Sequence, residues 1–275
     1  MDIYWIYDIP SLELGLGIKA VFLTVSLTAL VATRGIIAKH FYKSHEADQA
    51  VSAIFGAVGM LYGLLLGLVA VAAWQNFDKL NDLVDEEAAS IIQLYRCVNV
   101  LKDPSHEAIL ADLKTYTKDI IEISWPAHKH GQSPMTGIDL ITTLHKKLAN
   151  YESKAKNQPA SYSEAVSAFS DMVKARRMRV NGVDIGIPSA LWIVIIGGAV
   201  LTIPITFFFH LPSLKTHALL TGFYVVFLAG MIALIAVLDN PIRGEISIST
   251  EPYQKALEAM TRIDEDNHAI SNDLK

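Results

Sequence analysis

Five carboxylates follow directly on an apolar run that extends from Val51 to Phe77 without a charged side chain. The carboxylates are Asp78, Asp82, Asp85, Glu86 and Glu87. Carboxylates that face the lumen of a membrane pore favour cations, whereas carboxylates that face outward are only solvated. Neither proline nor glycine lies between the run and these carboxylates, so a helix that spans a membrane is expected to continue into water.

Glu87 differs from the other four carboxylates because it lies on an apolar seam of the predicted helix. The apolar side chains after Asp78 follow a heptad seam in which Glu87 occupies the position of a missing apolar residue; they are Leu80, Val84, Ile91, Leu94, Val98 and Leu101. A carboxylate on this seam points into a packing surface. Two interpretations follow: a partly exposed glutamate paired with a neighbour, or a functional carboxylate with a raised pKa.

Four glycines lie on one face of the helix predicted over residues 51–77, namely Gly56, Gly59, Gly63 and Gly67. Small-residue stripes let helix backbones approach closely in hydrocarbon, either within one subunit or between subunits around a pore. Helical geometry places an apolar set near the opposite face, with Phe77 at its end; the set is Leu61, Leu65, Val69 and Ala72. Such side chains could line a pore and gate ions by dewetting.

The spacing of apolar runs predicts an all-α integral membrane protein with four spans. Two spans are expected at about 14–33 and 51–77 and two within 185–238, because about 20 apolar residues cross a bilayer. Residues 78–184 are expected to form a helical domain, residues 239–275 a tail, and residues 1–13 a short N-terminal segment. A small excess of Lys and Arg beside the helical domain favours cytoplasmic termini and a cytoplasmic domain in a bacterial inner membrane.

Composition narrows the classes of function. The net charge of −5 gives no basic footprint for nucleic acid, and a single cysteine excludes an intrachain disulfide and a multi-cysteine metal site. His128 and His130 flank Lys129 in a segment that reads as a polar loop, where their spacing is weak evidence for a metal. No nucleophile elbow, phosphate-binding loop, dinucleotide fingerprint or helical zinc motif is present, so an enzyme is not expected.

The junction after the last predicted span carries a resemblance to a known family. It reads Leu238-Asp239-Asn240-Pro241-Ile242-Arg243-Gly244-Glu245, and Ser249-Thr250-Glu251-Pro252-Tyr253 follows it. Together with the segment from Gly63 to Tyr95 and the order of spans, these motifs resemble a bacterial family of bestrophin-like membrane proteins, distantly similar to bestrophin anion channels. The resemblance implies a homo-oligomer, with a pentamer as the bestrophin precedent, whose second span lines the pore.

The same resemblance bears on the cofactor and on two acidic residues. Bestrophins follow this motif with an acidic run that helps to bind calcium, but here Ile246-Ser247-Ile248-Ser249 follows instead. No cofactor is therefore predicted, and calcium stays an alternative only through the resemblance. Asp239 and Glu245 either coordinate ions or take part in gating, or they belong to a structural helix stop built on Pro241 and Gly244.

The sequence thus predicts an oligomeric, passive ion channel in contact with lipid, with anions favoured by the resemblance. A cation channel of the same architecture is the alternative if the carboxylates face the lumen. A second alternative is a membrane scaffold or sensor that binds a partner through its cytoplasmic domain and does not conduct.

Overall fold

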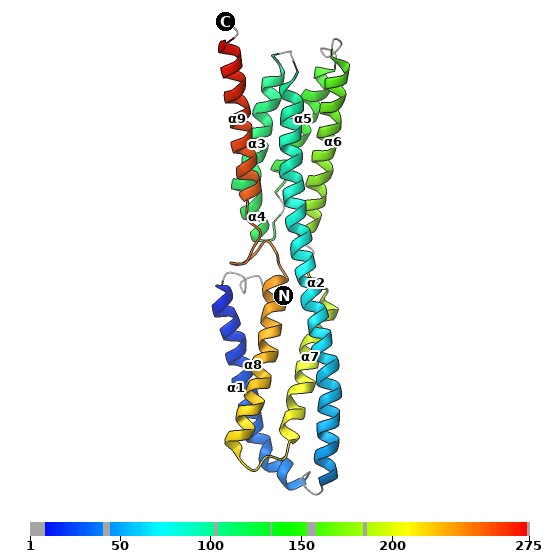
Figure 1. Ribbon diagram of the computed structural model, residues 1–275, viewed down its shortest axis with the longest axis vertical. Helices are drawn as coiled ribbons and strands as arrows, with labels where there is room; N and C mark the ends of the chain where they lie inside the picture. Colours follow the sequence, from blue (N-terminus) through cyan, green and yellow to red (C-terminus); the bar gives the residue numbers. More distant parts are fainter. Residues whose placement is uncertain are drawn as a thin grey trace. The chain divides into compact units, whose positions relative to one another are not determined.

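The computed structural model describes residues 9–40, 45–101, 104–132, 134–152, 158–183 and 186–273. The described residues form helices and turns without a strand, as the all-α prediction requires (Figure 1). The helices in order are α1 (Ser11–His40), α2 (His45–Asn99), α3 (His106–Asp119), a π-helical turn (Ile120–Ser124), α4 (Trp125–Lys129), α5 (Thr136–Tyr151), α6 (Pro159–Gly182), α7 (Ser189–Ile205), a 3-10 turn (Thr206–Phe208), α8 (Leu214–Leu238) and α9 (Glu251–Asp273).

The chain divides into two compact units, and each is described by itself. The membrane unit comprises Met1–Phe77 and Gly186–Ile246, and the helical unit comprises Asp78–Ile185 and Ser247–Lys275. The tail predicted from residue 239 is therefore shared, since its first part belongs to the membrane unit and α9 to the helical unit. The predicted N-terminal segment before residue 9 and the predicted domain end at residue 184 lie outside the described residues.

Within the described ranges, four helices are long and apolar enough to cross a membrane, in agreement with the predicted number of spans. They include the whole of α1 and α8, the apolar part of α2, and α7 with its following 3-10 turn. In the membrane unit, α1 packs along α8, and a cluster of buried apolar side chains joins the four helices. Leu30, Leu66, Ile195 and Val225 each represent one helix in this cluster.

One contact fixes α2 against α7 inside the membrane unit. The Tyr62 hydroxyl donates a hydrogen bond to the carbonyl oxygen of Ile195 over 2.5 Å. The Tyr62 ring lies over Gly198, where an added Cβ would be only 2.2 Å from the Tyr62 Cε2 atom. Gly198 is therefore required for this close approach, because any side chain would collide with the ring.

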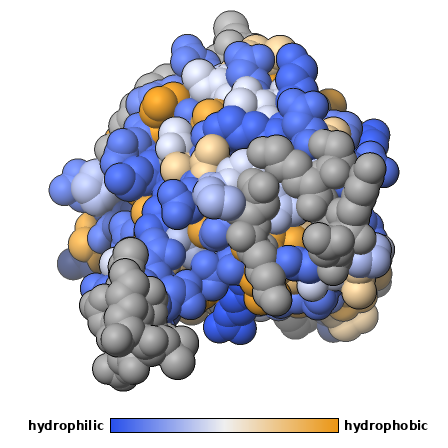
Figure 2. All heavy atoms as spheres, turned by 90° about the horizontal axis from the view of Figure 1, so that it is seen from above, coloured by the Kyte–Doolittle hydropathy of each residue, from blue (hydrophilic) through white to orange (hydrophobic). Residues whose placement is uncertain are grey.

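The helical unit packs α3, α5, α6 and α9 with the polar part of α2. The seam predicted along α2 is confirmed, since Leu80, Val84, Ile91, Leu94 and Val98 are all buried. The face shown in Figure 2 is mainly hydrophilic, with scattered apolar residues. Burial of the seam and a polar exterior are what an aqueous environment favours.

The polar loop predicted from His128 to Thr136 begins two residues later than expected, because His128 and Lys129 still belong to a helix. Residues Trp125–Lys129 form α4, entered through the π-helical turn, and His128 is buried. The chain turns only after His130, where Gly131 adopts a φ of 73°. The apolar contacts of Trp125 extend the helical path beyond the point at which composition alone suggests a loop, because tertiary packing overrides local preference.

Candidate functional site

The glycine stripe of α2 lies on an open face of the membrane unit. A Cβ built on Gly56, Gly59, Gly63 or Gly67 meets no heavy atom within 4 Å. Packing of these glycines against another helix of the same subunit is therefore not found, although the sequence allowed it. The second interpretation, close packing between subunits, stays a prediction.

The residues predicted to line a pore do not share one environment. Leu61 is 62% exposed and Ala72 is exposed, whereas Leu65 and Phe77 are half-buried. Val69 is wrong as a pore residue, because it is buried in the core of the membrane unit. The reason is geometric: Val69 continues the buried seam of Tyr62, Leu66 and Ala73 at spacings of three and four residues, which keeps it on the inner face of α2.

The outward face of α2 is apolar and lies beside the glycine stripe. Met60, Leu64, Leu68 and Val71 form one stripe of exposed large side chains on this face, and Leu61 beside the stripe is exposed to a similar degree. The four residues of the stripe were not among the predicted pore-lining residues, because that prediction used the face opposite the glycines; Leu61 was among them. In the structure, the glycines lie along one edge of the exposed face. The buried seam lies on the side of the helix opposite to that face.

Four of the five carboxylates after the apolar run are solvent-exposed. Asp78, Asp82, Asp85 and Glu86 are exposed on α2, and only Glu87 is buried. The five carboxylates therefore divide into four exposed residues and one interior residue. Each exposed member is free to interact with ions or with water, while Glu87 belongs to a different environment.

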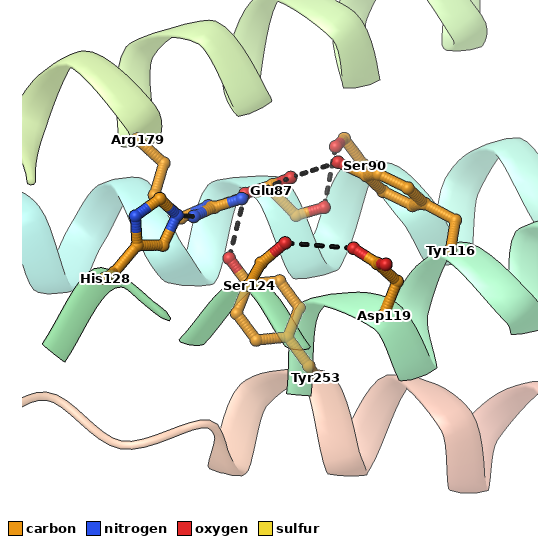
Figure 3. A network of polar contacts seen from close by, with 8 residues as sticks. All are labelled: Glu87, Ser90, Tyr116, Asp119, Ser124, His128, Arg179 and Tyr253. Atoms are coloured by element: carbon orange, nitrogen blue, oxygen red, sulfur yellow. Dashed lines mark hydrogen bonds and ion pairs between the residues drawn. The ribbon is translucent and has the colours of Figure 1, made fainter. Parts of the chain in front are cut away.

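Glu87 is the centre of a buried polar cluster in the helical unit (Figure 3). Its side chain is 0% exposed and forms an ion pair with Arg179 of α6, which is also buried. The Tyr116 hydroxyl donates to Glu87 Oε1 over 2.6 Å, and the Tyr253 hydroxyl donates to Oε2 over 2.9 Å. Side chains from α2, α3, α6 and α9 thus converge on one carboxylate.

The protonation states in this cluster follow from its contacts. Burial opposes the guanidinium charge, yet the neighbouring carboxylate of Glu87 raises the pKa of Arg179 above its ordinary value. Burial, followed by the charge of Glu87, raises the pKa of Tyr116 and of Tyr253 well above the usual range. At neutral pH the arginine is therefore charged and both hydroxyls are donors, so each is matched to the ionised carboxylate.

His128 completes the cluster on the side of Arg179. The Nη1 atom of Arg179 lies 3.3 Å from His128 Nε2 (Figure 3). A guanidinium only donates, so this imidazole nitrogen must accept and the ring is uncharged. Nearby, the Ser124 hydroxyl donates to Asp119 Oδ2 over 2.9 Å within the π-helical turn. The cluster therefore joins α2, α3, α4, α6 and α9, and both oxygens of the Glu87 carboxylate accept hydrogen bonds.

The sequence indicated Glu87 but not its partners. Arg179 was not singled out from the sequence, although Met172, Ala175 and Arg179 share the buried face of α6. That helical periodicity could have shown that Arg179 points inward, unlike exposed Lys174 and Arg177. Tyr116 and Tyr253 carry no comparable signal, because aromatic residues on a seam are ordinary core residues.

The junction after α8 forms a second polar arrangement, inside the membrane unit. Asp239 accepts hydrogen bonds from the backbone N–H of Ile187 over 2.5 Å and from Trp192 Nε1 over 3.2 Å. Burial raises the pKa of Asp239 although these two donors oppose the shift. Glu245 accepts from the backbone N–H of Ser11 over 3.0 Å. Both acidic side chains therefore fasten chain segments together, and Gly244 supplies the turn with a φ of 84°.

Comparison with known proteins agrees with this architecture. A family model described as the Bestrophin-like domain matches residues 20–253. The chain belongs to the bestrophin-like family. No curated protein matched the sequence.

Solved structures give the fold of this bestrophin-like chain independent support. A bacterial bestrophin homologue from Klebsiella pneumoniae, carrying a single substitution, is 14% identical at a TM-score of 0.68 over 89% of this chain and 96% of the other. Another structure of that homologue gives 13% identity and a TM-score of 0.65 over 88% and 96%. At such identity the likeness establishes the fold alone, whereas the family predicted from the junction motif is confirmed by the family model over residues 20–253.

The bestrophin-like chain thus offers three sets of candidate residues. The outward face of α2 is apolar, the Glu87 cluster is buried, and the junction acids are engaged by backbone and indole donors. No group of three or more metal-ligating side chains occurs among the residues that the structure describes.

Proposed function

We propose that this protein is an oligomeric ion channel of bestrophin type, whose pore is lined by the apolar part of α2. The observation that carries the proposal is the outward face of α2, where Leu64 and Leu68 are exposed beside glycines with open space above them. A ring of such faces around a symmetry axis would give an apolar constriction, and the glycine stripe would let neighbouring subunits approach closely.

The order of residues on α2 supports a revised set of pore residues. Met60, Leu64, Leu68 and Val71 recur at spacings of three and four and form one continuous exposed stripe. Leu61 and Ala72 lie on its edge, whereas Leu65 and Phe77 are half-buried beside it. We take the stripe as the lumen-facing surface and Leu61 and Ala72 as its border.

We propose that the permeating ions are anions, as membership of the family suggests, and that the assembly is a pentamer. A cation channel is the second candidate, because the exposed carboxylates Asp78, Asp82, Asp85 and Glu86 would attract cations if they faced the lumen. The helical unit and both termini are proposed to be cytoplasmic, in a bacterial inner membrane, on the excess of Lys and Arg beside that unit.

We propose further that conduction needs neither a cofactor nor calcium, and that the protein is not an enzyme. Asp239 and Glu245 already accept hydrogen bonds from groups of the membrane unit. The four residues that follow Glu245 contain no carboxylate. Removing calcium with a chelator is therefore expected to leave the conductance unchanged.

Recording from purified protein in planar bilayers with asymmetric salt tests the proposal. Leu64→Ser should change the conductance, and Leu219→Ser is the matched control, because both leucines are exposed, 60% on α2 and 58% on α8. A reversal potential that follows chloride supports an anion pore, and one that follows the cation replaces it by the second candidate. Folded, oligomeric protein that stays silent would favour a scaffold that binds a partner.

A further inference from the structure

A cavity of about 400 Å³ lies inside the membrane unit, beside the first turns of α2 and α8. Its lining combines polar and aromatic side chains, which include Asp48, Phe55, Phe209, His217 and Tyr224. A volume of this size falls in the range of small-molecule sites, and such sites typically combine apolar walls with a few polar groups.

His217 contributes a hydrogen-bond acceptor that lacks a partner. The residue is 1% exposed, and its Nε2 atom lies 2.9 Å from the carbonyl oxygen of Thr206. A carbonyl oxygen only accepts, so Nε2 carries the hydrogen, and in the neutral form of an imidazole the other nitrogen, here Nδ1, presents a lone pair. This Nδ1 has no hydrogen-bond partner among the residues that the structure describes. Buried polar atoms are rarely left unpaired, so a missing donor is implied.

Asp48 adds a second acceptor and a negative charge to the same cavity. The described residues that line the cavity include no lysine or arginine, and the imidazoles of His210 and His217 share it with the Asp48 carboxylate. A ligand that bonds to both Asp48 and His217 Nδ1 as acceptors must donate hydrogen bonds, and a positive charge on it complements the Asp48 carboxylate. The carboxylate disfavours an anion, and the absence of a group of three metal-ligating side chains in the described parts of the chain argues against a metal ion.

Aromatic rings form part of the remaining wall. The ring of Phe55 meets those of Phe209 and Tyr224 edge to face, with centroids 5.3 Å and 5.2 Å apart. Aromatic rings attract cations through their electron-rich faces and also accommodate apolar carbon. The wall therefore suits the carbon part of an organic cation.

We propose that this cavity binds a small organic ammonium ion, with its N–H groups on Asp48 and His217 and its carbon part against Phe55. The site is distinct from the exposed face of α2, so it does not depend on whether that face lines a pore. The ligand is defined by its chemistry: a positively charged amine with a compact apolar or aromatic substituent.

Calorimetric titration of phenethylammonium into the full-length protein in lipid nanodiscs tests the proposal, with empty nanodiscs as the blank. Saturable binding is expected, and Asp48→Asn should weaken it at least tenfold. Glu13→Gln is the matched control, because it removes an exposed carboxylate of the same unit that does not line the cavity. The uncharged analogue 2-phenylethanol should bind at least tenfold more weakly than the amine.

His217→Asn provides a second variant whose result does not depend on the carboxylate. It should weaken amine binding while the protein still elutes as the same oligomer. Three results would overturn the proposal: no saturable heat above the blank, equal affinity for the amine and the alcohol, or equal effects of Asp48→Asn and Glu13→Gln.

Discussion

The two parts of α2 share one helix but follow opposite rules of burial. In the membrane unit, the apolar part exposes Leu64, Leu68 and Val71 and buries a narrow seam. In the helical unit, the polar part buries every apolar position of its seam and even a carboxylate, Glu87. The hydrophobic effect requires burial only where water surrounds the helix, so an exposed leucine carries a different meaning in each part.

Different kinds of contact fix the packing of the two parts of α2. The membrane part relies on shape, as Gly198 accommodates the Tyr62 ring and the glycine stripe leaves space outside the subunit. The helical part relies on charge and hydrogen bonds, because Glu87 and Arg179 are stable in the interior only as a fully matched pair. Changes of charge should therefore disturb the helical unit most, and changes of side-chain volume the membrane unit.

The largest effect is expected when one partner of the buried ion pair is removed. Arg179→Met leaves the Glu87 charge uncompensated in the interior, which typically costs about 3–5 kcal/mol. Hydrogen exchange of the helical-unit amides should report the loss as faster opening. The double variant Glu87→Gln with Arg179→Met should regain much of that stability, since no unpaired charge is then left inside.

A matched control for this variant is Lys255→Met, which breaks the exposed ion pair with Glu251 on α9. No measurable change is expected, because exposed pairs are screened by solvent. If Arg179→Met and Lys255→Met had the same effect, Glu87 would not be the central residue of the helical unit.

A smaller effect is expected for Tyr253→Phe, which removes one donor from Glu87 and leaves the ion pair intact. A hydrogen bond to a charged group contributes about 1.5–3 kcal/mol, so α9 should open more readily than α3 or α6. Amide exchange along α9 measures this difference. Tyr162→Phe, at a half-buried position on α6, serves as the control, and equal exchange in the two variants would contradict the prediction.

Two glycines of the membrane unit give a matched pair of volume changes. Gly198→Ala would bring Cβ within 2.2 Å of the Tyr62 ring, and such overpacking costs about 1–3 kcal/mol. Gly63→Ala meets no atom within 4 Å, so the subunit should keep its thermal stability. If the stripe packs subunits together, Gly63→Ala should instead lower the fraction of oligomer measured by native mass spectrometry.

The result for Gly63→Ala separates the two interpretations of the stripe. An intact oligomer would show that the stripe faces lipid or the pore lumen. A dissociated oligomer with a folded subunit would place it at the interface between subunits.

Much of the fold could be predicted from the sequence, because its signals are local. Four apolar runs of sufficient length gave the spans, and the heptad spacing after Asp78 gave the buried seam. Glu87 was recognisable as an interruption of that spacing. Its ion pair with Arg179 was not, because residues far apart in sequence meet only through the packing of α2 against α6.

The errors in the membrane part have a related cause. Helical periodicity defines faces relative to one another, but it does not say which face meets the rest of the subunit. Val69 was therefore assigned to the wrong side, since the buried seam runs through Tyr62 and Leu66. His128 was assigned to a loop because polar composition hides the apolar contacts that Trp125 contributes to α4.

The smallest change in stability is expected from the protonation of Asp239, in the junction after α8. Burial raises the pKa of this carboxyl above its ordinary 3.8, so the folded junction binds a proton more tightly than the unfolded chain does. The stabilisation from that proton is complete below pH 3.8 and is lost as pH rises through the folded value. Protonation of Asp239 should thus favour the folded junction. Fluorescence of Trp192, the donor to Asp239, can follow the titration, and Asp239→Asn should flatten it; an unchanged profile in that variant would show that another group titrates there.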